Sequence, residues 1–277
     1  MKKSFTIGST ARVVGVLIVL GIAVFPLYWM FVTSLTPSSN LFTSTPQLLP
    51  DFAHFGVYLS ALGTGQIAIW LGNSLLIATG TTIVAIGLGI PLGYSLSRFS
   101  YRGKGIVGLM LLLTQMLPEA LLVVPLFAIF KQFGLLNSQL GLIMVDSAFV
   151  LPIVALILKG AIDGIPRELE EAARVDGARP LGVLLRINLP LIAPSVAASA
   201  VIAFFSGWNE YVMAVTFTFD ATKQPASVGL ASYIGDLSTP LDTVMAVGIM
   251  YTLPAVVFYL FAQRYVVAGM TAGSVKG

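Results

Sequence analysis

Long apolar runs alternate with short polar segments along the whole chain. Crossing ~30 Å of hydrocarbon takes about 20 helical residues, and six runs are long enough to do so. They are Val13–Leu35, Ile67–Ser97, Ile106–Phe130, Leu140–Leu158, Leu189–Phe219 and Val244–Gln263. The second and fifth runs exceed one crossing, so each is expected to include an interfacial piece or a tilted helix. The pattern predicts an all-α integral membrane protein with six transmembrane helices in a single domain over residues 1–277.

Composition agrees with this class and excludes several kinds of chemistry. Hydrophobic residues make up 57% of the chain and charged residues 10%, whereas a soluble domain carries roughly 25% charged residues. The chain has no cysteine and a single histidine, His54, which excludes a disulfide framework, a thiolate metal site and any site that needs two imidazoles. The first apolar run is longer than a signal-peptide core and no small-x-small cleavage site follows it, so we expect a retained first span.

The basic residues indicate how the spans are oriented. With six spans and a cytoplasmic N-terminus, only Lys131 and Lys223 fall outside. The other 13 basic residues fall inside, namely Lys2, Lys3, Arg12, Arg98, Arg102, Lys104, Lys159, Arg167, Arg174, Arg179, Arg186, Arg264 and Lys276. This bias follows the positive-inside rule. Both termini and the segment 163–190 are therefore predicted to be cytoplasmic, and the segments 36–66 and 220–242 are predicted to be outer loops.

The segment 163–190 is far more charged than the rest of the chain. Pro166 suits the first position of a helix, and three glutamates follow it, where carboxylates favour the positive end of the helix dipole. Asp176-Gly177 is a stop signal, and a second helical stretch is expected over Leu181–Ile187. A solvated amphipathic connector is one interpretation. The small pair Ala172-Ala173 favours the other, a surface that comes close to a partner.

Within this segment, the spacing of seven residues resembles the signature loop of bacterial ABC import permeases, E-A-A-x3-G-x9-I-x-L-P. The matching residues are Glu171, Ala172, Ala173, Gly177, Ile187, Leu189 and Pro190. In that family the loop forms a coupling helix, which docks in a cleft of the ATPase subunit. The resemblance implies that Glu171 pairs with a basic residue there, that the two alanines allow close packing, and that Gly177 supplies the turn. It also implies the type I ABC importer permease fold.

Other segments resemble the maltose-type carbohydrate uptake group of these permeases. The segment 267–277, the end of "YVVAGMTAGSVKG", resembles a cytoplasmic tail that reaches between the two ATPase subunits. The stretch "SGWNEY", Ser206–Tyr211, resembles the Trp-Asn-Glu/Asp element of the group. The outer loop 220–242 corresponds to one that reaches into the cleft of the sugar-binding protein. The resemblance implies a permease subunit of an ATP-driven importer for a disaccharide or oligosaccharide, which forms half of the translocation pathway.

The resemblance also implies partners and a location. The partners are a second homologous permease subunit, two ATPase subunits that bind ATP and Mg, an extracytoplasmic sugar-binding protein and membrane lipid. The location is the bacterial cytoplasmic (inner) membrane, with a multi-pass topology. The chain has no G-x4-G-K-[S/T] phosphate loop, so ATP hydrolysis is expected from the partner ATPase. We expect no catalytic residue, metal site or cofactor in this chain, and no nucleic acid partner.

Polar and aromatic residues at membrane depth are candidates for lining a sugar pathway. Charges at the centre of a span cost ~2.5–3.5 kcal/mol each on insertion scales, so they tend to face a cavity or a partner. Aromatic faces suit a sugar ring, and carboxylates accept hydrogen bonds from its hydroxyls. The candidates are Gln115, Glu119, Asp146, Trp208, Asn209 and Glu210. The alternatives are contacts between helices or, for Asp146 and Glu210, a place near the outer interface. In the maltose system the partner permease makes the sugar contacts.

Two further patterns concern the geometry of the helices. Gly89-x3-Gly93 is a small-x3-small step, which is expected to allow close helix packing with no further meaning for function. Four prolines in apolar runs are expected to interrupt helices. They are Pro91, Pro118, Pro125 and Pro152.

Other function classes leave features of the chain unexplained. An ABC permease for a non-sugar solute shares the coupling loop and differs mainly in the tail. A self-contained secondary transporter predicts an internal repeat, which the sequence lacks, and does not explain the charged segment. A membrane enzyme would need paired histidines, a clustered acidic motif or a nucleophile–base pair, and the sequence has none of these.

Overall fold

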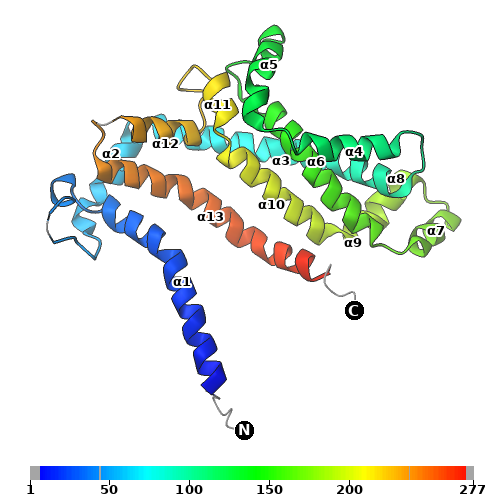
Figure 1. The fold of residues 1–277 in the computed structure, drawn as a ribbon, viewed down its shortest axis with the longest axis horizontal. Helices are drawn as coiled ribbons and strands as arrows, with labels where there is room; N and C mark the ends of the chain where they lie inside the picture. The colour runs from blue at the N-terminus through cyan, green and yellow to red at the C-terminus, as the bar shows by residue number, and fades with distance from the viewer. Residues whose placement is uncertain (1–6, 44, 237, 273–277) are drawn as a thin grey trace. The chain divides into compact units, whose positions relative to one another are not determined.

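The computed structural model describes residues 7–43, 45–236 and 238–272, and every regular element within these ranges is helical (Figure 1). Helices satisfy their backbone polar groups internally, as apolar segments in a bilayer require. In chain order the elements are α1 Ile7–Ser34, η1 Ser38–Asn40, η2 Phe52–Phe55, α2 Gly56–Gly63, α3 Gln66–Arg98, α4 Lys104–Thr114, α5 Glu119–Gln132, α6 Gln139–Asp163, α7 Arg167–Val175, α8 Pro180–Val183, η3 Leu184–Asn188, α9 Leu189–Leu191, α10 Ala193–Asn209, α11 Val212–Phe217, α12 Ala226–Gly235 and α13 Leu241–Ala272. Of the short elements, η1 and η2 are 3-10 helices and η3 is a π-helix.

Among the described residues, four helices are long and apolar enough to cross a membrane. They are α1 over Arg12–Ser34, α3, α6, and α13 over Leu241–Gln263. Two further candidates are bent pairs: α4 with α5, at 106°, and the stretch Pro180–Leu191 with α10, at 82°. The predicted runs Ile106–Phe130 and Leu189–Phe219 are therefore not single straight helices. Six crossings result only if each bent pair is one span.

Proline explains one of these bends but not every expected interruption. Pro118 precedes α5 as its N-cap residue, with φ −62° and ψ 124°. Pro91, Pro125 and Pro152 lie inside α3, α5 and α6, which continue through them. For these three the expected interruption is wrong. One missing hydrogen bond in an apolar helix costs less than unwinding a turn and leaving several backbone groups unpaired.

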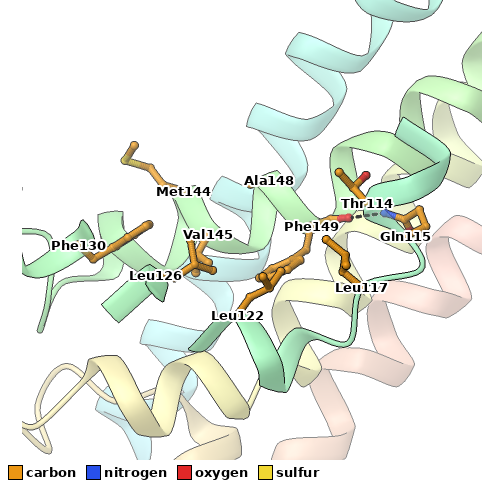
Figure 2. A pocket seen from close by; sticks show the side chains of 10 residues that line it. All are labelled: Thr114, Gln115, Leu117, Leu122, Leu126, Phe130, Met144, Val145, Ala148 and Phe149. Atoms are coloured by element: carbon orange, nitrogen blue, oxygen red, sulfur yellow. Dashed lines mark hydrogen bonds between the residues drawn. The ribbon is translucent and has the colours of Figure 1, made fainter. Parts of the chain in front are cut away.

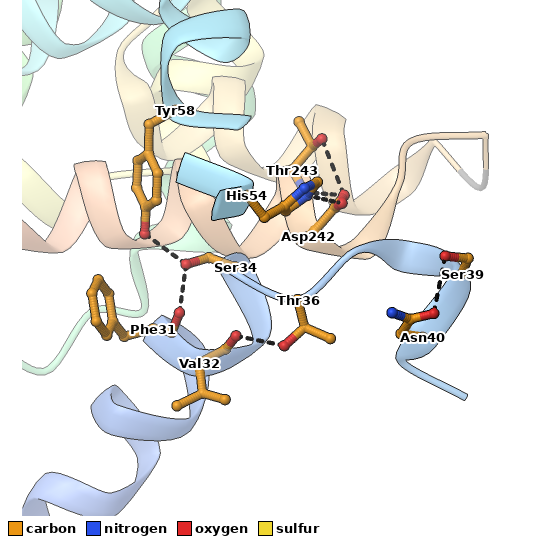
Figure 3. Close-up of polar contacts among 10 residues, drawn as sticks. All are labelled: Phe31, Val32, Ser34, Thr36, Ser39, Asn40, His54, Tyr58, Asp242 and Thr243. Carbon is orange, nitrogen blue, oxygen red and sulfur yellow. Dashed lines mark hydrogen bonds and ion pairs between the residues drawn. The ribbon is translucent and has the colours of Figure 1, made fainter. Parts of the chain in front are cut away.

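The contacts divide the chain into two units, and the first consists of residues 1–67 and 230–253. Its small core contains Leu35, Val57, Tyr58 and Ala246. Polar contacts fasten the predicted outer loop 36–66 to this core: the Ser34 and Tyr58 hydroxyls lie 2.6 Å apart, and His54 Nε2 lies 2.9 Å from Asp242 Oδ2 (Figure 3). The described residues of the segment 36–66 thus form part of this unit and contain η1, η2 and α2.

The second unit consists of residues 68–229 and 254–277, and its core forms where α3, α6 and α10 pack together. Buried core residues include Ala85, Val154, Leu158 and Ala203. A Cβ atom on Gly93 would lie 3.0 Å from both the Ala155 carbonyl oxygen and the Lys159 backbone nitrogen. Glycine therefore lets α3 touch the backbone of α6, which confirms the predicted close packing at Gly89-x3-Gly93.

Candidate functional site

The helix α7 carries the first half of the motif found in the sequence. Pro166 is its N-cap residue, so the helix begins one position after the predicted start at Pro166, and two glutamates occupy the first turn. At the other end Gly177 has a φ of +85°. The Gly177 N–H donates to the Arg174 carbonyl at 3.0 Å, and the Ala178 N–H donates to the Ala173 carbonyl at 2.9 Å. This pair of bonds is a Schellman motif, so the helix ends sharply at the predicted glycine.

Exposure divides α7 into two faces. Glu171 and Ala172 are exposed, and Val175 is 88% exposed. Ala173 is half-buried and Glu170 is 2% exposed, because they face the rest of the second unit. One face of α7 is thus used for packing within the chain, and the other presents a carboxylate, a methyl group and an isopropyl group to the surroundings.

The second half of the motif shapes the chain that follows. Leu184–Asn188 is π-helical, and Pro190 follows in α9. A proline cannot donate to the carbonyl four residues earlier, and a π-helical turn accommodates this locally by bonding over five residues. Ile187 and Leu189 are half-buried. These residues therefore pack on their own chain next to the bend that leads into α10.

Sequence reasoning missed the partner that fixes α7. Arg98, the last residue of α3, donates from Nε to Glu170 Oε1 at 2.6 Å, and its side chain is 5% exposed. The sequence signals were the end-of-span position of Arg98, which we assigned to the positive-inside bias, and the place of Glu170 beside the motif. Neither signal indicates that these two residues, which lie 72 positions apart in the chain, contact each other.

Three carboxylates expected at membrane depth lie close enough for their charges to interact. They are Asp146 in α6, Glu119 at the start of α5, and Glu210. Asp146 is 2% exposed, and neither of its carboxylate oxygens has a hydrogen-bond partner among the residues that the structure describes. Glu210 accepts from the backbone N–H groups of Met213 at 2.7 Å and Ala214 at 2.8 Å. Glu210 therefore also has a structural role, because it satisfies the free N–H groups of α11.

The other three candidates have different surroundings. Trp208 is 1% exposed and stacks on Phe204, with ring centroids 5.8 Å apart, whereas Asn209 is exposed. Gln115 is exposed in the break between α4 and α5, where it donates to the Phe149 carbonyl at 3.0 Å (Figure 2). Gln115 thus lies in the break, and the exposed Glu119 is the first residue of the helix that follows it.

A cavity of about 370 Å³ opens beside this break. Figure 2 shows Gln115 and Thr114 at one end and apolar side chains over the remainder of the wall. The other lining residues are Leu117, Leu122, Leu126, Phe130, Met144, Val145, Ala148 and Phe149. An apolar wall offers sugar hydroxyls few partners, and of the six pathway candidates only Gln115 is among the lining residues.

The first part of the predicted outer loop 220–242 is held firmly by α3. The Asn73 amide donates to the carbonyls of Thr222 at 2.9 Å and Gln224 at 2.8 Å, and the Trp70 indole donates to the Ala221 carbonyl at 2.8 Å. Beside them, Asp220 is exposed. Hydrogen bonds from the Thr222 backbone and hydroxyl lower the pKa of its carboxyl. The loop therefore begins as a fixed turn with an exposed carboxylate, and α12 follows it.

The predicted tail 267–277 begins inside a helix. The helix α13 extends to Ala272, and residues 273–277 lie outside the described residues. The implied contact of this tail with ATPase subunits stays a prediction.

The described residues, whose regular elements are all helical, include long apolar helices and one charged helix at the surface, and they define the class of α-helical membrane proteins. Residues 85–272 match the family described as "Binding-protein-dependent transport system inner membrane component". The chain belongs to this family, which confirms the resemblance to ABC import permeases. It is a multi-pass inner-membrane transport subunit and not an enzyme.

Individual relatives match along nearly their whole length. The trehalose transport system permease protein of Mycobacterium tuberculosis is 34% identical over 263 residues, which cover 94% of this chain and 95% of the relative. The diacetylchitobiose uptake system permease protein of Streptomyces coelicolor is 29% identical over 279 residues, and both chains are covered fully, at 100%. A chain in the crystal structure of a bacterial ABC transporter that imports the polysaccharide alginate has the same fold, with a TM-score of 0.82 at 23% identity, over 96% of this chain and 99% of that chain.

Proposed function

We propose that this chain is the permease subunit of an ATP-driven importer for a disaccharide or oligosaccharide. It forms half of the translocation pathway, and the segment 163–190 couples it to a separate ATPase. The carbohydrate class is supported by the relatives named for trehalose and diacetylchitobiose, which match over almost the whole chain.

One observation carries the coupling role: α7 is anchored on one face and open on the other. Glu170 is buried against the second unit, whereas Glu171, Ala172 and Val175 are exposed. A helix that is fixed on one face and ended by a Schellman motif moves as a rigid body with the helices that hold it. Its open face has the charge and the small side chains that close docking to another protein requires. A displacement imposed on that face would reach the membrane helices.

The proposed docking of α7 to a separate ATPase implies the other subunits of the assembly. Two ATPase subunits bind ATP and Mg and move the coupling helices. A second homologous permease completes the pathway, and an extracytoplasmic binding protein delivers the sugar. Each bent pair counts as one crossing, which gives six, with both termini and the segment 163–190 in the cytoplasm. The tail 267–277 adds a second contact with the ATPase subunits.

Within the membrane, the break between α4 and α5 is the proposed place of the sugar route. Gln115 and Glu119 lie at the two ends of the break. The charges of Asp146 and Glu210 interact with that of Glu119. Irregular backbone at membrane depth is tolerated where it lines a cavity or is buried in protein. Trp208 and Asn209 end α10 next to Glu210 and complete this polar region.

Charge reversal at Glu171 tests the coupling role. In a complex purified through a tag on this chain and reconstituted in proteoliposomes, Glu171→Lys should reduce sugar uptake at least tenfold and abolish the stimulation of ATP hydrolysis by the binding protein. Membrane insertion should be normal, since the side chain is exposed. Arg102→Glu is the control, because it reverses an exposed charge outside the segment 163–190. Wild-type uptake by Glu171→Lys would refute the coupling role.

A further inference from the structure

Arg98 makes three directed contacts at the point where α3 ends. Its Nε donates to Glu170 Oε1 at 2.6 Å, and its Nη2 donates to the carbonyls of Ile162 and Ile165 at 2.8 Å each. The side chains of Arg98 and Glu170 are 5% and 3% exposed. A single guanidinium therefore joins α3 to α7, to the last turn of α6, and to the linker between α6 and α7.

Physical chemistry makes this contact specific for arginine. The last carbonyls of α6 have no partner within the helix, and the end of the helix dipole favours a cation there. A planar guanidinium can serve two carbonyls and a carboxylate at fixed angles, whereas an ammonium is a single compact charge. Because both partners are buried, removal of either one leaves an uncompensated charge.

Neighbouring residues of α3 reinforce the same junction. The Ser97 hydroxyl donates to Asp163 at the end of α6, and the Tyr94 hydroxyl lies 3.5 Å from the Pro180 carbonyl at the start of α8. On α7 itself, Arg174 Nη2 lies 3.7 Å from Glu170 Oε2. The last five residues of α3, 94–98, thus contact every helical piece from the end of α6 to the start of α8.

The contact engages the face of α7 that the proposed docking leaves free. Glu170 is buried against Arg98, and the neighbouring Glu171 and Ala172 are exposed. Successive residues of a helix differ by about 100° around its axis, so Glu170 and Glu171 point in different directions. A displacement of the docked face of α7 would therefore move Glu170 and, through it, Arg98. Without the Arg98 contact, α7 would be held by the linkers 164–166 and 176–179 and by the hydrogen bond between Arg174 and the Tyr94 hydroxyl of α3. The second linker contains Gly177 in a turn.

We propose that Arg98 and Glu170 form a clamp that passes the movement of α7 directly into α3. This inference rests on the proposed docking of α7 to an ATPase. Arg98 is a positioning residue, because it acts through α7 and does not touch the ATPase or the sugar. With the clamp, displacement of α7 moves α3 and α6 together; without it, α7 pivots on its linkers and ATP is hydrolysed with little transport.

The test compares sugar transported per ATP hydrolysed in the reconstituted complex. Arg98→Lys keeps the positive charge but loses the planar guanidinium with its several donors. Glu170→Gln keeps the shape of the side chain but loses its negative charge. Each should assemble with the ATPase and reduce transport per ATP at least fivefold. The double variant Arg98→Met/Glu170→Leu replaces the buried pair with apolar side chains, and it should also assemble and remain uncoupled. Lys159→Gln, which removes a partly exposed ion pair with Asp163 in the last turn of α6, should stay within twofold of wild type.

A second readout separates the clamp from the docking. Val175→Cys, combined with a maleimide–succinimide cross-linker, should link α7 to a lysine of the ATPase subunit, both alone and together with Arg98→Lys. No cross-link in the otherwise unaltered chain would refute the proposed function. A retained cross-link with wild-type transport per ATP in Arg98→Lys or Glu170→Gln would overturn the clamp alone. Failure of all three clamp variants to assemble would overturn it as well, because the pair would then serve folding and not coupling.

Discussion

Two neighbouring carboxylates show how strongly a single position decides a role in this protein. Glu170 and Glu171 are chemically alike and adjacent in α7, yet Glu170 is 2% exposed and Glu171 lies open to the surroundings. The motif identifies Glu171, because its spacing from the alanines and Gly177 can be read along the chain. Glu170 gains its role from Arg98, 72 residues away, and no local pattern records that contact.

At Gly177 the backbone conformation, and not a lack of space for a side chain, favours glycine. Its φ is +85°, and an added Cβ would meet no atom within 4 Å. Gly177→Ala is therefore expected to cost about 1–2 kcal/mol through the left-handed backbone alone, and to loosen the end of α7. Hydrogen exchange of the Gly177 and Ala178 amides in the purified complex should become faster.

The matched control for this variant is Gly182→Ala in α8. Its added Cβ would lie 4.0 Å from the nearest side-chain atom, Ala178 Cβ, and no positive φ applies there. Alanine is the better helix former by roughly 0.8–1 kcal/mol, so exchange should be unchanged or slower. Equal protection of Gly177→Ala and the unaltered chain would contradict the strain argument.

At the scale of elements, the turn after α11 depends on hydrogen bonds from a distant helix. Asn73 of α3 donates to Thr222 and Gln224, and it accepts from the Gln139 amide at 3.1 Å. Asn73→Ala should destabilise this turn by about 1–3 kcal/mol, because two part-buried hydrogen bonds of about 0.5–1.5 kcal/mol each are lost. We expect faster hydrogen exchange over residues 219–226 and weaker stimulation by the binding protein.

An exposed asparagine supplies the control for the hydrogen-exchange measurement on Asn73→Ala. Asn40 lies in η1, and its side-chain oxygen accepts from the Ser39 hydroxyl at 3.3 Å, so Asn40→Ala should change exchange by less than twofold. Unchanged protection of residues 219–226 in Asn73→Ala would show that the Trp70 contact and the packing of α12 hold the turn without the amide.

The same scale shows where hydropathy stops being informative. Apolar content predicted that Ile106–Phe130 crosses the membrane but could not predict a 106° bend within it. Proline was an ambiguous signal: Pro118 lies at a break, whereas Pro125 lies inside α5. Whether a proline breaks a helix depends on whether neighbouring elements can satisfy the freed backbone groups, and that is a property of packing.

At the scale of the whole molecule, the proposed topology can be tested without background labelling because the chain contains no cysteine. Val175 and Leu49 are 88% and 75% exposed, and they lie in segments assigned to opposite sides of the membrane. Val175→Cys should react with a membrane-impermeant maleimide only in inverted vesicles, and Leu49→Cys only in right-side-out vesicles. Labelling of both from one side would refute the six-crossing arrangement.

The sequence by itself determined the membrane class, the all-helical architecture and the coupling motif. Each of these depends on local quantities, namely the hydrophobicity of about 20 consecutive residues, the internal hydrogen bonding of helices, and the fixed spacing of the motif residues. These can be read from neighbouring positions in the chain.

Only the tertiary structure decided which face of α7 is free, where two apolar runs bend, and which helix holds α7 in place. The Arg98–Glu170 pair, the touching backbones of α3 and α6 at Gly93, and the hydrogen bonds of Asn73 all join residues more than 60 positions apart. Such contacts arise when helices pack, because an unpaired charge or backbone group is most costly where it is buried.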